Sequence, residues 1–237
     1  MTVRLDILRR ESADAVPRRQ VFLYEPESAA DTVATALTRL NAREDLRDAE
    51  GRPAAPIRWD CSCLQKKCGA CAMVIDGRPA LACDTRLSDH GNTITLEPLR
   101  KFPCVADLIV DRSALYEALR DLRVWLEGER AADGGELCYE SARCLQCGCC
   151  LEVCPNFCPG GAFSGMAAAV PMARLLAQAP GKQQKALRRA YRQHVFEGCG
   201  KSLACRNICP AGIDIDHVLS ASNAAAVWNR LWKELRP

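Results

Sequence analysis

Cysteines are the residues of this sequence that are best placed to do chemistry, and most of them fall into three groups. The chain has 16 cysteines among 237 residues. The first group lies in CSCLQKKCGACAMVIDGRPALAC, residues 61–83. Four of its members show the C-x4-C-x2-C spacing with a remote fourth cysteine, namely Cys63, Cys68, Cys71 and Cys83. This spacing is typical of a plant-type [2Fe–2S] cluster, in which each of two irons takes two protein thiolates.

Neighbouring residues agree with this interpretation, and the alternatives fit the spacing less well. Gly69 and the small Ala70 allow the backbone to approach the inorganic sulfides. Cys61 is out of register and would become a ligand only if the loop slipped. Zinc also takes four cysteines, but structural zinc usually binds paired, closely spaced knuckles. A Rieske centre needs two histidines, and His90 has no suitable partner nearby. The spacing therefore favours [2Fe–2S].

The other two groups resemble each other. Residues 144–155, CLQCGCCLEVCP, match the bacterial ferredoxin run C-x2-C-x2-C-x3-C-P in full. Residues 199–210, CGKSLACRNICP, follow the same run except that Ser202 replaces the second cysteine. In two-cluster ferredoxins the fourth cysteine of each run ligates the other cluster. The crossed pattern predicts a [4Fe–4S] cluster on Cys144, Cys147, Cys150 and Cys209, and a second cluster on Cys154, Cys199 and Cys205.

This second cluster has three thiolates, because Ser202 supplies none. Three thiolates suit a [3Fe–4S] cluster, which is a cube that lacks one iron. A serine oxygen can also bind iron, so a [4Fe–4S] cluster with Ser202 as a ligand remains open. Cys149 and Cys158 are predicted to be small apolar packing residues near the clusters. No role is predicted for the remaining cysteines, which are Cys61, Cys104 and Cys138.

The composition indicates metal ligands in a reducing compartment rather than disulfides. With 237 residues and 49% hydrophobic residues, the chain can form two domains with packed cores. Its start does not resemble a signal peptide, and Arg9-Arg10 is interpreted as surface charge because no apolar segment follows. Apolar runs such as 165–172 are too short to span a bilayer. A net charge of +3 gives no argument for nucleic acid.

Residue periodicity predicts a small α+β domain over residues 1–105 and a mainly helical domain over 106–237. In the first, we expect strands at 2–9, 20–24 and 92–99, a helix at 31–45 capped by Asp31, and a hairpin of 72–75 with 78–82 around Asp76-Gly77. In the second, we expect helices at 113–126, 166–178, 183–196 and 214–235. A basic face is interpreted as solvated; it comprises Lys182, Lys185, Arg188, Arg189 and Arg192.

A plant-type loop followed by two bacterial-type runs, the second with one cysteine lost, resembles the iron–sulfur subunit of the succinate dehydrogenase and fumarate reductase family (respiratory complex II). The likeness covers nearly the whole chain and includes EPLRKFPCVADLIVDRSALYEAL, of which residues 97–111 resemble the linker between two domains. The resemblance implies an α+β protein in which an N-terminal β-grasp ferredoxin domain precedes an all-α ferredoxin domain.

The resemblance also implies an electron-transfer subunit that performs no bond chemistry itself. An FAD-containing flavoprotein partner would oxidise succinate or reduce fumarate, and electrons would pass through [2Fe–2S], [4Fe–4S] and [3Fe–4S] clusters to a quinone. Membrane-anchor subunits that bind quinone and haem b would hold the chain at the cytoplasmic face of the plasma membrane. No G-x-G-x-x-G follows a predicted strand, so the flavin is expected on the partner.

By position in the family, the quinone is expected near Pro155, Phe157, Gly200 and Ser202. Ubiquinone-linked members have an aromatic pair that includes tryptophan after the first Cys-Pro, and a histidine after the first cysteine of the last run. Here the corresponding segments are CPNFCPG and CGKS. This departure favours menaquinone.

Two rival classes remain. A free multi-cluster ferredoxin is usually small and acidic, whereas this chain is nearly neutral. The iron–sulfur subunit of another flavin-linked oxidoreductase often carries Cys-Cys-Gly motifs, whereas Leu151 follows Cys149-Cys150 here. Clusters or zinc that act only as structural staples would not require three sites of graded type.

Overall fold

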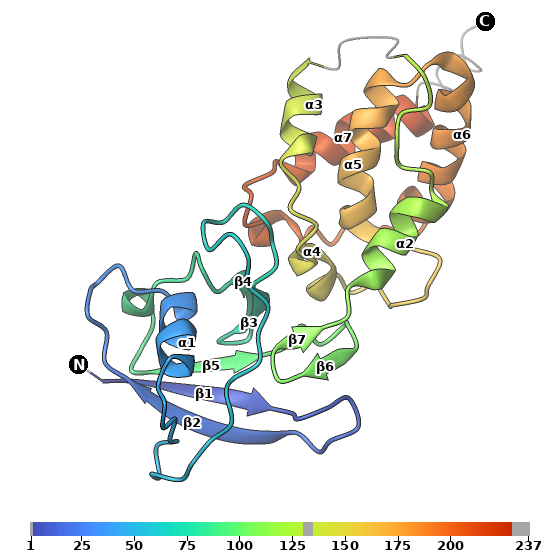
Figure 1. Ribbon diagram of the computed structural model, residues 1–237. Coiled ribbons are helices and arrows are strands. Elements are labelled where there is room, and N and C mark those ends of the chain that lie inside the picture. The colour runs from blue at the N-terminus through green and yellow to red at the C-terminus, as the bar shows by residue number, and fades with distance from the viewer. Residues whose placement is uncertain (1, 130–134, 229–237) are drawn as a thin grey trace, which may run out of the picture. The chain divides into compact units, whose positions relative to one another are not determined.

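The computed structural model describes residues 2–129 and 135–228. The chain divides into two compact units, residues 1–111 (the first unit) and 112–237 (the second unit) (Figure 1). The first unit is built on a mixed sheet, and the second consists of helices and cysteine-bearing loops. The α+β class expected from the sequence is therefore confirmed.

Five strands form the main sheet of the first unit, in the order β2-β1-β5-β3-β4. They are β1 (Val3–Arg9), β2 (Arg18–Tyr24), β3 (Ala72–Ile75), β4 (Arg78–Leu81) and β5 (Thr93–Glu97). β1 runs antiparallel to β2 and parallel to β5, while β3 pairs antiparallel with both β4 and β5. Alternation along β1 places Val3, Leu5 and Ile7 in the core. Asp76, with φ of 47°, and Gly77, with φ of 78°, form the predicted turn between β3 and β4.

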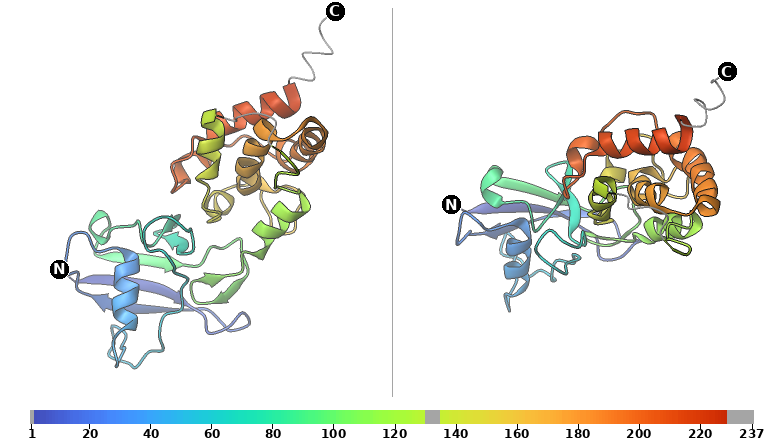
Figure 2. Two further views of the ribbon diagram at one scale, coloured as in Figure 1. Left: turned by 45° about the horizontal axis from the view of Figure 1, so that its top comes forward. Right: turned by 90° about the horizontal axis from the view of Figure 1, so that it is seen from above.

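Helix α1 (Val33–Asn41) lies across one face of this sheet (Figure 2) and buries its apolar side, including Leu37 and Leu40. Its N-cap is Thr32, whose hydroxyl accepts a hydrogen bond from the Thr35 N–H at 3.2 Å. The expectation that Asp31 caps the helix is wrong. The Asp31 carboxylate instead accepts hydrogen bonds from Tyr24 Oη at 2.7 Å and from Arg39 Nη1 at 2.9 Å.

A short hairpin of β6 (Cys104–Ala106) and β7 (Ile109–Val110) ends the first unit. Its turn residue Asp107 pairs with Arg9, which is only 4% exposed. The interpretation of Arg9 as surface charge is therefore wrong. Arg9 continues the inward alternation of β1, and its guanidinium lies over the Phe22 ring, with 5.6 Å from Cζ to the centroid.

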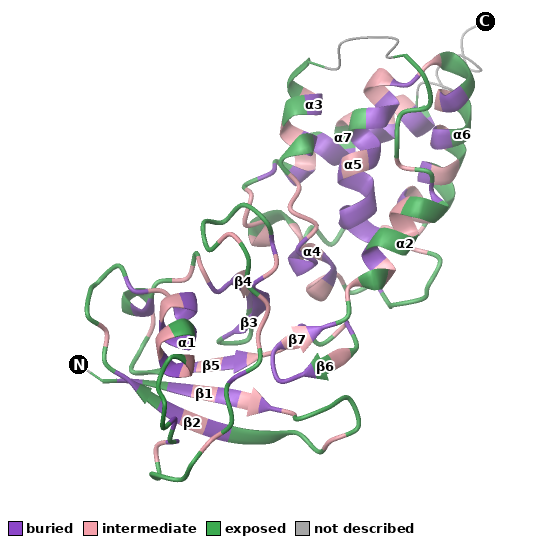
Figure 3. Cartoon of the chain, viewed as in Figure 1, coloured by how far each residue is buried: buried purple, intermediate pink, exposed green. Residues whose placement is uncertain are grey.

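The second unit contains six α-helices within its described residues: α2 (Ser113–Asp121), α3 (Gly135–Ala142), α4 (Cys149–Glu152), α5 (Gly165–Gln178), α6 (Gly181–Tyr191) and α7 (Ile215–Asn223). Helix α5 is largely buried (Figure 3) and contacts α3, α6 and α7. None of the helices in residues 2–129 and 135–228 is long and apolar enough to cross a membrane.

Several predicted helix bounds differ from the structure. The helix expected at 113–126 ends at Asp121, and Arg123 then takes a left-handed φ of 53°. The helices expected at 183–196 and 214–235 both change to π-type turns, at Arg192–Phe196 and Ala224–Trp228. Residues 229–235 lie outside the described part of the chain.

Candidate metal centres

The first cysteine group surrounds a loop whose backbone N–H groups point at sulfur. The N–H groups of Gln65 and Lys67 donate to Cys63 Sγ at 3.4 and 3.2 Å. The N–H of Lys66 donates to Cys83 Sγ at 3.3 Å, although Cys83 follows the β3–β4 hairpin in the sequence. These donors stabilise negative charge on sulfur, as a thiolate ligand requires.

Left-handed backbone conformations turn these amides inward. Leu64 and Lys66 have φ values of 53° and 58°, and Gly69 has φ of 75°. Successive N–H groups in such turns form an anion-binding concavity that is common at iron–sulfur and phosphate sites. Glycine adopts this conformation freely, whereas Leu64 and Lys66 do so at a cost, which is typical of functional loops.

The thiols of this group are in contact with one another. Hydrogen bonds from the N–H groups of Gln65 and Lys67 lower the pKa of Cys63 to about 7, and the Cys68 side chain also hydrogen-bonds to it. Burial raises the pKa of Cys71 to about 12, and the hydrogen-bonded Cys83 thiol and the nearby Cys68 add to the shift. The structure thus brings together the four predicted ligands. Cys61 is exposed.

The second and third groups interleave in the second unit. Burial and then the charges of neighbouring thiols raise the pKa of Cys150 far above its usual value; those thiols are Cys147, Cys144, Cys205 and Cys209. Burial also raises the pKa of Cys144 to about 11, with Cys147 and Cys209 as its charged neighbours. Cys209 therefore lies beside the cysteines of the other run.

Cys205, which neighbours Cys150, also lies near two further thiols, Cys154 and Cys199. Burial raises the pKa of Cys205 to about 11, and the charges of Cys154 and Cys199 contribute. Cys154 belongs to the first run, so each run contributes its last cysteine to the other set. Buried thiols with raised pKa values stay protonated by themselves, whereas a bound metal deprotonates a coordinating thiol. Both sets therefore have the chemistry that an iron–sulfur cluster needs.

The two runs also share a backbone pattern. Gln146 and Gly148 have φ values of 50° and 86°, and the residues at the corresponding steps of the last run, Lys201 and Leu203, have 54° and 55°. In the first run Cys147 lies between the two left-handed residues, and in the last run Ser202 lies there. Ser202 thus occupies the backbone position of a ligand.

The residues expected near a quinone lie on two adjacent segments. Pro155, Gly200 and Ser202 are exposed, whereas Phe157 is buried. Asn156, which sequence reasoning did not single out, joins the segments by donating from Nδ2 to the Gly198 carbonyl at 3.0 Å. A Cβ atom at Gly200 would lie 3.1 Å from Asn156 Oδ1, so the two segments are in close contact there.

The cysteines outside the three sets differ in environment. Cys149 is fully buried, as a packing residue should be, and its thiol hydrogen-bonds to Cys147, lowering the pKa of Cys147 to about 7. Cys158 is exposed, so its predicted packing role is wrong; it precedes a Pro-Gly-Gly turn on the surface. Cys138 is buried, with Sγ 3.7 Å from the Arg174 carbonyl, and Cys104 is half-buried.

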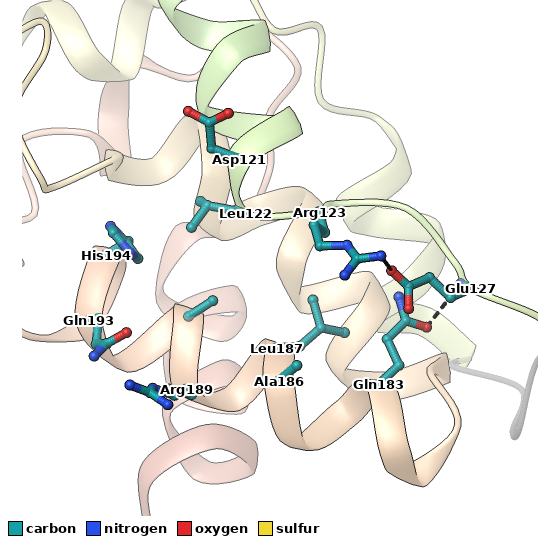
Figure 4. A pocket seen from close by; sticks show the side chains of 11 residues that line it. Asp121, Leu122, Arg123, Glu127, Gln183, Ala186, Leu187, Arg189, Gln193 and His194 are labelled. Atoms are coloured by element: carbon teal, nitrogen blue, oxygen red, sulfur yellow. Dashed lines mark hydrogen bonds and ion pairs between the residues drawn. The ribbon is translucent and has the colours of Figure 1, made fainter.

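A cavity of about 240 Å³ lies elsewhere in the second unit, between the end of α2 and α6. Figure 4 shows its rim, where Arg123 pairs with Glu127 at 2.7 Å and Gln183 accepts the Glu127 N–H at 3.0 Å. No cysteine is among the described residues that line it. The cavity is therefore separate from the cysteine sets.

In residues 2–129 and 135–228, no group of three or more His, Cys, Asp or Glu side chains has the arrangement of ligands around a single metal ion. The ligand sets therefore rest on the spacing of the runs and on the proximity of the thiols, and they stay predictions.

Thiols gathered beside inward-facing N–H groups define the class: this is an iron–sulfur protein. A family model described as a 2Fe-2S iron-sulfur cluster binding domain matches residues 4–117.

Similar proteins narrow the class. The succinate dehydrogenase iron-sulfur subunit of Bacillus subtilis is 31% identical over 94% of this chain and 91% of its own length. The fumarate reductase iron-sulfur subunit of Haemophilus influenzae is 25% identical over 92% and 96%. A chain of the Mycobacterium smegmatis Sdh1 complex has the same fold, with a TM-score of 0.74, 21% identity and 99% of both chains covered. The chain belongs to the family of succinate dehydrogenase and fumarate reductase iron–sulfur subunits.

Proposed function

We propose that this chain carries single electrons between a flavoprotein subunit and a membrane quinone in a succinate dehydrogenase or fumarate reductase. The observation that carries the proposal is the interleaving of the last two cysteine runs, in which Cys209 lies near Cys144 and Cys150, and Cys154 lies near Cys205. Adjacent clusters provide one-electron redox steps when bound, and the chain itself makes or breaks no bonds of the substrate. The names of its relatives support the same role.

Three clusters are assigned to the thiol sets. The [2Fe–2S] cluster is held by Cys63, Cys68, Cys71 and Cys83; the [4Fe–4S] cluster by Cys144, Cys147, Cys150 and Cys209; and the [3Fe–4S] cluster by Cys154, Cys199 and Cys205. The shared backbone pattern of the two runs supports Ser202 as the residue at the vacant corner. The sheet order and the helical second unit support a β-grasp ferredoxin domain followed by an α-helical ferredoxin domain. The boundary expected at 105/106 falls inside β6, so we place it after the β6–β7 hairpin, at 111/112.

The N–H groups around the first set have a defined task. Gln65, Lys66 and Lys67 donate to two of its sulfurs, which withdraws electron density from the ligands. Hydrogen bonds to sulfur are one of the levers that raise the reduction potential of an iron–sulfur centre. This loop therefore favours acceptance of an electron from the flavin.

The partners follow from the same assignment: an FAD-containing flavoprotein, and membrane subunits that bind quinone and haem b and hold the chain at the cytoplasmic face. The quinone lies near Pro155, Gly200 and Ser202, with Phe157 supporting the segment from within the core. A Cβ atom at Gly200 would lie 3.1 Å from Asn156 Oδ1, so a larger side chain there would require Asn156 to shift. This supports a site unlike the histidine-bearing site of ubiquinone-linked members, and we favour menaquinone.

The test uses the complex purified with its flavoprotein and membrane subunits. Succinate should reduce all three clusters and then a menaquinone analogue, each followed by electron paramagnetic resonance and by quinone absorbance. Cys205→Ala should abolish quinone reduction while succinate still reduces an artificial dye through the flavoprotein. A complex in which succinate reduces none of the clusters would contradict the proposal.

A further inference from the structure

The side chain of Gln146, which lies between Cys144 and Cys147 in the sequence, makes two polar contacts. Its side-chain Nε2 lies 3.2 Å from Cys144 Sγ and 3.0 Å from the Ala167 carbonyl oxygen. An amide nitrogen has two N–H groups, so it can serve both acceptors at once. The reversed amide would place Oε1 against the Ala167 carbonyl, which offers no hydrogen, and against Cys144 Sγ, which offers none once it is a cluster thiolate. The orientation with Nε2 inward is therefore the one that these neighbours require.

The Ala167 carbonyl on α5 can accept a hydrogen bond from outside the helix because its usual donor within the helix is missing. In a regular helix the N–H of residue 171 would bond to the carbonyl of Ala167, but residue 171 is Pro171, which has no N–H. A proline inside the helix thus leaves this carbonyl for an outside donor, and Gln146 occupies it. The proline and the glutamine together direct an amide at Cys144.

The arrangement is costly and it is specific to the first run. Gln146 has a left-handed φ of 50°, and its Oε1 is buried without a hydrogen-bond partner among the described residues. The corresponding residue of the last run, Lys201, instead places its ammonium 4.9 Å from the centroid of the Phe196 ring. The amide is therefore a feature of the four-iron site and not a general requirement of the loop.

We propose that Gln146 is a positioning residue that orients Cys144 and raises the reduction potential of the [4Fe–4S] cluster, an inference that rests on the proposed function. An N–H directed at a ligand sulfur stabilises the more negative, reduced cluster more than the oxidised one. Removing it makes reduction harder. The centre affected is the one between the other two clusters in the assigned order.

The test compares two substitutions in the whole complex. Gln146→Met keeps the length of the side chain and removes the amide. Gln184→Met is the matched control, because Gln184 Nε2 also donates to a carbonyl of α5, that of Leu176 at 3.0 Å, with no sulfur in the bond. Potentiometric titration followed by electron paramagnetic resonance gives the midpoint potential of each cluster.

Gln146→Met should lower the equilibrium constant for one-electron reduction of the four-iron cluster by about tenfold, which is about 59 mV. The other two clusters, and all clusters in Gln184→Met, should keep the wild-type potentials. An unchanged four-iron potential in Gln146→Met, or an equal shift in the control, would overturn the proposal. A wild-type protein without any four-iron signal would instead overturn the proposed function.

A second measurement needs no variant and decides the matter if Gln146→Met fails to assemble. Wild-type protein is labelled with [15N-amide]glutamine, and pulsed electron paramagnetic resonance of the reduced four-iron cluster is recorded. Coupling to a glutamine side-chain nitrogen supports the contact. Absence of that coupling, in a sample with a full four-iron signal, overturns it.

Discussion

Arg9 and Asp107 form an ion pair inside the first unit, with 3.0 Å between Nε and Oδ1 and side-chain exposures of 5% and 3%. The Asp107 carboxylate also accepts the N–H groups of Arg10 at 2.8 Å and Arg58 at 2.9 Å. The pair joins β1, the β6–β7 hairpin and the segment that leads into the first cysteine group. The start of that group therefore depends on a carboxylate far away in sequence.

Breaking this pair should be strongly destabilising. Asp107→Asn leaves the buried Arg9 charge without its anionic partner, with only neutral acceptors around it, and we expect a loss of about 3–5 kcal/mol in the free energy of unfolding. The control is Asp45→Asn, which breaks the exposed pair of Asp45 with Arg47 at 2.8 Å and should cost less than about 1 kcal/mol. Urea unfolding followed by circular dichroism measures both. Equal losses in the two variants would contradict the role given to Asp107.

Asp48 should make stability depend on acid pH. Burial alone would raise the pKa of Asp48, but hydrogen bonds from Gln20 and from the N–H groups of Arg52 and Glu50 outweigh it and lower the pKa to about 2. Because this lies below the unfolded value of about 3.9, the contribution to stability is complete above that value and is lost as the pH falls toward 2.

The variant Asp48→Asn removes this contribution. It should be less stable than the wild type at pH 7, and the difference between the two urea midpoints should shrink as the pH falls below about 4. A difference that stays constant between pH 7 and pH 2.5 would show that the charge of Asp48 is not responsible.

Much of the first unit could be predicted from local pattern. The β3–β4 hairpin combines two-residue alternation with an Asp-Gly turn, and both signals act over a few residues. The burial of Arg9 could not be predicted, although Arg9 shares the inward face of Val3, Leu5 and Ile7. A charge is buried only when a partner such as Asp107 is near, and local pattern does not reveal that partner.

The cluster sites also combine features that local sequence predicts with features that depend on residues far away in the chain. Cysteine spacing alone predicts the ligand sets, since a cluster imposes its geometry on nearby residues. The contacts of Gln146 and Asn156 could not be predicted, because each depends on a backbone carbonyl that only the folded chain brings close. The π-type turns that end two of the helices also have no local sequence signal.

The crossed ligation predicts opposite effects for two cysteines of similar position. Cys154→Ala should abolish the three-iron signal although Cys154 belongs to the first run, and Cys209→Ala should perturb the four-iron site. The [2Fe–2S] signal, whose predicted ligands lie in the first unit, should persist in both and serves as the internal control. Electron paramagnetic resonance distinguishes the three signals. Loss of the four-iron signal alone in Cys154→Ala would show that the ligation is not crossed.

Ser202→Cys should convert the three-iron cluster into a four-iron cluster. The new thiolate would face the vacant corner, and thiolate binds iron more strongly than an unactivated hydroxyl does. We expect a lower potential, and each decrease of about 59 mV makes reduction tenfold less favourable. Quinone reduction should fall at least tenfold, while dye reduction by the flavoprotein persists. A three-iron signal of wild-type strength in the oxidised variant would place Ser202 away from the vacant corner.

The central claim, three clusters of graded type on one chain, is tested most directly by metal and sulfide analysis of the complex purified without oxygen. The assigned clusters predict about nine irons per chain, as two, four and three, together with about ten acid-labile sulfides and no stoichiometric zinc. Iron bound to the partner subunits, including haem, is measured separately and subtracted. Two irons or fewer per chain, accompanied by stoichiometric zinc, would contradict the account.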